Sequence, residues 1–254
     1  MARSDDVADL KRRLVNVLRI LEAEQQFELT YGHVSCRTRP GSDTYLILGD
    51  LHDRGLHVAE VGVDDLVTMS ADGTTRASER NAPGERFIHL GIYARRPDVN
   101  AVVHCHPQLP TVFSIAGVAI EPVDHLGVLF TPEVPIHDYS GQIDTIEKAQ
   151  ALAATLGSGA ATLIRSHGVA VVGSSLERAC VATLALDRTA RMQYLATQIG
   201  TARPIPQEFT DDGGHFSEGL SDREYFATAW AFYCWKHADR LIADETGKVN
   251  RLDV

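Results

Sequence analysis

Three histidines and one glutamate have the residue types and spacing of a metal site. His104 and His106 lie in the run A-V-V-H-C-H-P, His167 lies in I-R-S-H-G-V, and Glu85 precedes all three. Because side chains two positions apart in a strand point to the same face, the apolar run ending at Val103 places the two neighbouring imidazoles on one side. Imidazole and carboxylate ligands suit zinc, manganese, iron or cobalt. The pattern predicts a divalent metal ion with an open position for a substrate oxygen.

The alternative for each histidine is a half-buried polar residue with one good hydrogen bond. The position of His167 favours the metal-site interpretation, since this residue lies between the apolar runs 161–164 and 169–173, where a polar residue usually faces a cleft. Cys105 should point away from its histidine neighbours, as a small core residue and not a ligand. The four cysteines form no C-x-x-C pair, which indicates reduced thiols without disulfides.

Size and charge limit the class of protein. A chain of 254 residues with 44% hydrophobic residues predicts one domain spanning 1–254, with a helical tail over about 205–254. The net charge of −10 and the lack of a basic tract argue against nucleic acid or an anionic membrane as partner. No apolar stretch reaches the roughly 18 residues that span a bilayer. We therefore expect a cytoplasmic protein.

Apolar periodicity and turn residues predict an alternation of helices with strands and hairpins, which implies a layered α/β domain. The expected helices cover about 5–26, 108–116, 142–156, 175–199 and 221–243, and the expected strands include 31–37, 44–48 and 66–70. Pro83 opens a further helix that carries Glu85 in its first turn, directly before the H-C-H strand. The carboxylate and the two imidazoles can therefore converge. His89, one turn beyond Glu85, is expected to have a buried hydrogen-bonding role near the metal.

The ordered motifs G-H-V-S-C-R, P-G-E-R-F-I-H-L, R-P-D-V-N-A-V-V-H-C-H-P and S-H-G-V-A-V-V-G resemble those of the class II aldolase/adducin family over roughly residues 8–200. The resemblance implies a three-layer α/β/α sandwich around a largely antiparallel sheet, commonly assembled as a tetramer. It also implies that His104, His106 and His167 bind one divalent metal ion per subunit, zinc or manganese first, with iron and cobalt as alternatives. Glu85 matches the family's catalytic carboxylate, which can also bind the resting metal.

Three positions depart from the sugar-phosphate aldolases of this family. His33 stands in place of an asparagine, the loop Gly49-Asp50-Leu51-His52-Asp53 in place of a phosphate loop, and Pro83-Gly84 in place of two serines. The changes remove neutral donors and add acidic groups that repel a dianion. A phosphorylated sugar is therefore disfavoured. The altered motifs resemble the branch that decarboxylates hydroxy-aromatic or hydroxypyridine dicarboxylates.

The leading hypothesis is a metal-dependent decarboxylase for a small aromatic acid with a hydroxyl beside the leaving carboxylate, an activity typical of aromatic catabolism. Protonated Glu85 is the first candidate for the proton donor, with His125 and Tyr139 as alternatives. Arg165 or His33 would pair with a second substrate carboxylate, although Arg165 fits a structural ion pair equally well.

Two other classes stay open. The same metal and Glu85 suit a retro-aldol lyase for a non-phosphorylated hydroxy-keto substrate. A non-catalytic, adducin-like scaffold is the third hypothesis, which the metal-type histidines disfavour.

Overall fold

A single seven-stranded sheet forms the centre of the molecule, in the order β3-β2-β1-β4-β7-β6-β5. The computed structural model describes residues 4–51, 56–76, 80–210 and 222–249, so His52 and Asp53 of the acidic loop lie outside the described residues. All neighbouring strands are antiparallel except β5 and β6. The strands are β1 (His33–Arg37), β2 (Thr44–Leu48), β3 (Leu66–Ser70), β4 (Ala101–Cys105), β5 (Ile136–His137), β6 (Ala161–Ile164) and β7 (Gly168–Gly173).

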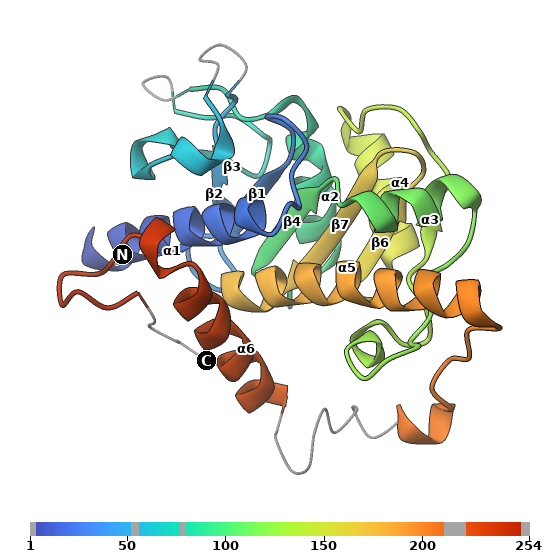
Figure 1. Ribbon diagram of the computed structural model, residues 1–254. Helices are drawn as coiled ribbons and strands as arrows, with labels where there is room; N and C mark the ends of the chain where they lie inside the picture. The colour runs from blue at the N-terminus through green and yellow to red at the C-terminus, as the bar shows by residue number, and fades with distance from the viewer. Residues whose placement is uncertain (1–3, 52–55, 77–79, 211–221, 250–254) are drawn as a thin grey trace.

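Helices cover both faces of this sheet. Helices α1 (Ser4–Ala23) and α5 (Leu176–Ile199) cross one face, with α3 (Gln108–Ala116) and α6 (Asp222–Lys236) packed against α5 (Figure 1). Helices α2 (Phe87–Arg95) and α4 (Ile146–Leu156) pack on the other. Alternate residues of β4 enter different cores, because Val103 and Cys105 join the α1/α5 core while Val102 joins the α2/α4 core. The predicted three-layer α/β/α sandwich is confirmed.

Helices α2 and α4 pack closely against each other. A Cβ at Gly91 of α2 would lie 2.7 Å from backbone atoms of Ala149 of α4. This contact lets α2 lie close to its neighbour while its other face packs on β1 and β4. Helix α2 thereby brings His89 and Tyr93 onto the sheet, where both are buried.

Several predicted helix boundaries were wrong. Helix α1 ends at Ala23 and not near residue 26, and α2 begins at Phe87, after a separate 3₁₀ turn that holds Glu85. Helix α4 begins at Ile146 and not near 142, because the Thr145 side chain accepts a hydrogen bond from the Lys148 backbone N–H and caps it there. Helix α6 ends at Lys236, since His237 leaves the helical conformation and its Nε2 contacts Glu24 Oε1 at 2.6 Å. All four cysteines are buried and unpaired, as expected. Among the described residues, no helix is long and apolar enough to span a membrane.

Candidate metal centre

The three predicted histidines meet at one point. One ring nitrogen each from His104, His106 and His167 lies within 4.8 Å of the other two. The Nε2 atoms of His104 and His106 are 3.2 Å apart, and the three ring centroids are each separated by 5.0 Å. Imidazole nitrogens that converge in this way present lone pairs to a shared point, which favours a cation between them.

A backbone contact sets the orientation of His104. Its Nδ1 lies 2.9 Å from the carbonyl oxygen of Val169 on the paired strand β7, and a carbonyl can only accept. Nδ1 therefore carries the proton, and Nε2 faces the other two histidines as a lone pair. This is the arrangement by which proteins commonly fix the tautomer of a metal-binding histidine.

His167 is brought in by the turn between β6 and β7. Ser166 has a φ of +55°, a conformation that costs a non-glycine residue free energy and is found at functional sites. Its backbone N–H donates to Ser114 Oγ of α3 at 3.0 Å, which stabilises the turn. A Cβ at Gly168 would lie 2.4 Å from the Cys105 carbonyl oxygen and 2.5 Å from His106 Cδ2, so only glycine permits this approach.

Glu85 completes the cluster from the other side. It lies in a 3₁₀ turn, Gly84–Arg86, directly before α2. Oε2 is 3.3 Å from His167 Nε2 and 3.8 Å from His104 Nε2, while Oε1 accepts a hydrogen bond of 2.9 Å from the Ile143 backbone N–H. Burial acts to raise the pKa of Glu85, but the hydrogen bonds that it accepts from His167 and from the Ile143 backbone outweigh burial and lower that pKa. Glu85 is therefore a carboxylate at neutral pH, and its predicted role as proton donor requires that it first take up a proton.

Two of the histidines around Glu85, His104 and His106, are uncharged at neutral pH. Burial, with the neighbouring imidazoles, lowers the pKa of His104 well below 6.5 and that of His106 to about 4. Neutral imidazole is the form that binds metals. Three imidazole nitrogen donors and one carboxylate fit a divalent cation, with His104, His106 and His167 as the ligands and Glu85 as a fourth.

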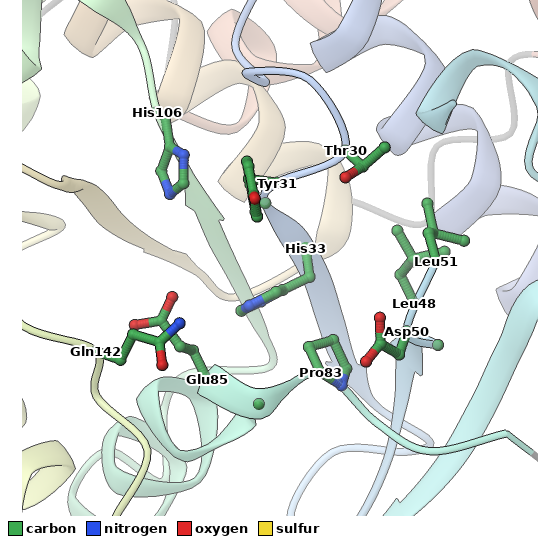
Figure 2. Close-up of a pocket in the computed structure, with 13 residues that line it drawn as sticks. Thr30, Tyr31, His33, Leu48, Asp50, Leu51, Pro83, Glu85, His106 and Gln142 are labelled. Carbon is green, nitrogen blue, oxygen red and sulfur yellow. The ribbon is translucent and has the colours of Figure 1, made fainter. Parts of the chain in front are cut away.

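A cavity of about 110 Å³ opens beside this cluster. Figure 2 shows Glu85, Gln142 and His106 on one side and Leu48, Asp50 and Leu51 on the other, with Tyr31 and Thr30 at the rim. Its described lining includes Asp50 and Glu85 but no lysine or arginine. An acidic lining without a cation is a poor site for a phosphate dianion.

Of the other predicted residues, some lie at the cavity and others do not. His33 lines the cavity, whereas Arg165 does not and instead forms an ion pair of 2.9 Å with Asp138. The role of Arg165 in substrate binding stays a prediction. The alternative proton donors also stay predictions: His125 is exposed, and Tyr139 packs against the α2/α4 core. The buried hydrogen-bonding role expected of His89 is confirmed by contacts of 2.6 Å to both His33 and Ser35.

Several residues near the site were missed by the sequence analysis. Ser35 lies two residues beyond His33 in G-H-V-S-C-R, on the same face of β1, and this alternation could have revealed it. Tyr31 comes just before that motif. By contrast, Ser114 and Tyr93 reach the site through helix packing, for which the local sequence holds no signal.

The fold and the site together define a three-layer α/β/α protein with a three-histidine cluster where the end of β4 meets the β6–β7 turn. The model of a protein family described as "Class II Aldolase and Adducin N-terminal domain" matches residues 12–194. The chain therefore belongs to the class II aldolase/adducin family, as its motifs indicated.

Individual relatives agree with this assignment. The chain is 27% identical over 219 residues to a 3,4-dihydroxyphthalate decarboxylase of Arthrobacter keyseri, covering 78% of this chain and 86% of the relative. It is 26% identical over 240 residues to a protein of the same name from Rhodococcus jostii, and the match covers 88% of this chain and 97% of the relative. Among solved structures, an aldolase II superfamily protein from Pseudomonas syringae has the same fold, with a TM-score of 0.77 and 23% identity. The match covers 92% of this chain and 94% of that protein. Family and relatives together support a lyase.

Proposed function

We propose that this protein is a divalent-metal-dependent decarboxylase of a hydroxy-aromatic acid, such as a dihydroxyphthalate or a hydroxypyridine dicarboxylate. One observation carries the proposal: His104, His106, His167 and Glu85 converge beside a cavity whose described lining holds no phosphate-binding cation. The decarboxylase relatives favour this chemistry over other lyase reactions.

Each residue of the site has a separate role in this proposal. The three histidines would hold the cation, zinc or manganese by preference, with iron or cobalt as alternatives. A divalent cation supplies Lewis-acid stabilisation of the negative charge that develops as carbon dioxide leaves. Glu85, as a carboxylate beside this cluster, would accept the proton of the substrate's ring hydroxyl and return it to the ring carbon as carbon dioxide leaves. His33 lies where it can position a substrate oxygen, and Arg165 would have to exchange Asp138 for a substrate carboxylate.

Metal analysis followed by an acid panel tests the proposal. Purified protein should contain about one divalent ion per chain and release carbon dioxide from 3,4-dihydroxyphthalate or a hydroxypyridine dicarboxylate, with loss of activity in chelator. Aldehyde release from a non-phosphorylated hydroxy-keto acid, without carbon dioxide, would instead establish the retro-aldol alternative. Protein folded and pure but without stoichiometric metal would favour the adducin-like scaffold.

Assembly and location belong to the same proposal. A homotetramer is expected from the family resemblance, and a cytoplasmic address suits an acidic chain with four unpaired cysteines. Light scattering of the purified protein and fractionation of cells test these two points separately from the chemistry.

A further inference from the structure

A chain of four polar side chains lies buried between the sheet and α2, beside the metal cluster. His33 Nδ1 is 2.6 Å from His89 Nε2, His89 Nδ1 is 2.6 Å from Ser35 Oγ, and Ser35 Oγ is 2.8 Å from the Tyr93 hydroxyl. Ser35 and His89 are fully buried, Tyr93 is 2% exposed and His33 6%. Each contact is short and has no competition from bulk water, so the positions of the protons along the chain are strongly constrained.

The chain can run in two directions, and its far end selects one. Among the described residues, the Tyr93 hydroxyl has Ser35 as its one hydrogen-bond partner. The Arg37 guanidinium, which stacks over the Tyr93 ring at 4.8 Å, has only donors and cannot accept the phenol proton. The phenol proton can therefore be accepted only by Ser35 Oγ. The reverse direction would leave that proton buried without an acceptor, at a cost that proteins generally avoid.

The remaining protons follow in order. Ser35, having accepted from Tyr93, donates to His89 Nδ1, which leaves the His89 proton on Nε2. His89 Nε2–H then donates to His33 Nδ1. Since the proton of a neutral imidazole occupies one nitrogen and Nδ1 is accepting, the His33 proton must lie on Nε2.

The His33 Nε2–H faces the site. The His33 ring lies between those of His89 and His104, with centroid distances of 4.8 and 5.0 Å. Its Nδ1 side is occupied by His89, so Nε2 is the edge presented to the cavity that His33 lines. Figure 2 shows this side chain pointing from β1 toward Glu85 and Gln142. Among the described residues that line the cavity, the one imidazole outside the metal cluster is thus a donor.

We propose that Tyr93, Ser35 and His89 are positioning residues that hold His33 in the Nε2–H form, so that His33 donates a hydrogen bond to an oxygen of the bound acid. The role rests on the proposed function, because it assigns the oxygen to a substrate carboxylate or phenolate. A fixed neutral donor binds such an oxygen without adding a charge beside the cation, and it cannot compete with His104, His106 and His167 for the metal. It also gives a physical reason for a histidine at this position.

Nitrogen-15 solid-state NMR of histidine-labelled protein tests the tautomer without any substrate. A His33→Asn variant identifies the His33 signals by their absence. The wild-type protein should carry the His33 proton on Nε2 alone. A proton on Nδ1, or on both nitrogens, at neutral pH overturns the inference whether or not the protein decarboxylates anything, so its failure is distinct from failure of the proposed function.

Variants then test the chain. Ser35→Ala removes the donor to His89 and should give a mixture of His33 tautomers, whereas His89→Gln keeps an N–H donor toward His33 and should retain Nε2–H. Tyr45→Phe is the matched control, since it removes a buried hydroxyl from the ring stacked on Tyr93 at 4.5 Å without breaking the chain. An unchanged His33 tautomer in Ser35→Ala would show that the chain does not control it.

Kinetics separate positioning from damage to the fold. Ser35→Ala should raise KM about tenfold at nearly constant kcat, the size of one lost hydrogen bond, because the contact serves ground and transition states alike. Tyr45→Phe should leave both constants near the wild-type values. A lower apparent kcat at unchanged KM in Ser35→Ala would mean only that less protein is correctly folded, and would overturn the positioning role.

Discussion

At the scale of single residues, Glu85 is the group whose state matters most. Its Oε1 is held by the Ile143 backbone N–H and its Oε2 faces His104 and His167, so one oxygen anchors the side chain and the other is directed at the site. Because the lowered pKa makes Glu85 an anion, it enters the reaction as a base or ligand. It becomes an acid only after taking up a proton.

Glu85→Gln tests this role. The amide oxygen can still accept from Ile143, and the three histidines remain, so the fold and the metal content should be preserved. Turnover should fall by about 100-fold or more, the usual size of a lost acid–base group. Glu147→Gln, which removes an exposed carboxylate from the first turn of α4, is the matched control and should keep full activity. Activity of Glu85→Gln close to that of the control would refute the assignment.

At the scale of elements, the approach of the β6–β7 turn to β4 forms the site. The turn carries His167, the strand carries His104, and His106 follows directly after the strand ends at Cys105. Register fixes the strand, because β4 pairs with both β1 and β7, and His104 lies opposite His33 and Ala170. The turn depends on Gly168, where two backbones approach too closely for any side chain.

Gly168→Ala should therefore damage the site more than the fold. The new methyl group must displace His106 or the Cys105 carbonyl, a type of overpacking that costs about 1–3 kcal/mol. We expect a melting temperature lower by several degrees and metal affinity weakened at least tenfold, measured by calorimetry and by competition with a chelator. Gly200→Ala, which meets no atom within 4 Å, is the control. Equal metal affinity in the two variants would exclude this role for Gly168.

The sequence predicted the elements of the site better than their convergence. Side-chain alternation correctly placed His104 and His106 together and Cys105 in the opposite core, because strand geometry is local. The contact of His167 with them needs the pairing of β4 with β7, which lies 63 or more residues away in the chain. Convergence was therefore supported from the sequence only by the position of His167 in a break between two apolar runs and by the family resemblance. The state of Glu85 could not be predicted, since its pKa depends on hydrogen bonds from His167 and from the Ile143 backbone N–H, both distant in the chain.

At the scale of the whole molecule, uncharged imidazoles are concentrated between the sheet and α2. Burial lowers the pKa of His89 to about 3 and that of His33 well below 6.5, and His104 and His106 are lowered for the same reason. The unfolded chain binds these protons near pH 6.5, whereas the metal-free folded chain binds them only at much lower pH. Between these limits the unfolded state holds more protons, so the free energy of unfolding must fall as the pH falls.

The metal-free protein should accordingly lose stability steeply between pH 6.5 and about 4. Each buried imidazole contributes up to about 1.4 kcal/mol per pH unit, and several together approach the whole stability of an ordinary domain, about 5–15 kcal/mol. Glu85 acts separately, because a lowered carboxyl pKa removes stability only below about pH 4.5. Melting temperatures of chelator-treated protein across this range measure the effect, and His89→Gln, with one buried imidazole fewer, should show a shallower slope. A melting temperature that is constant from pH 7 to pH 5 and falls only where carboxylates titrate would mean that these histidines are not held neutral by the fold.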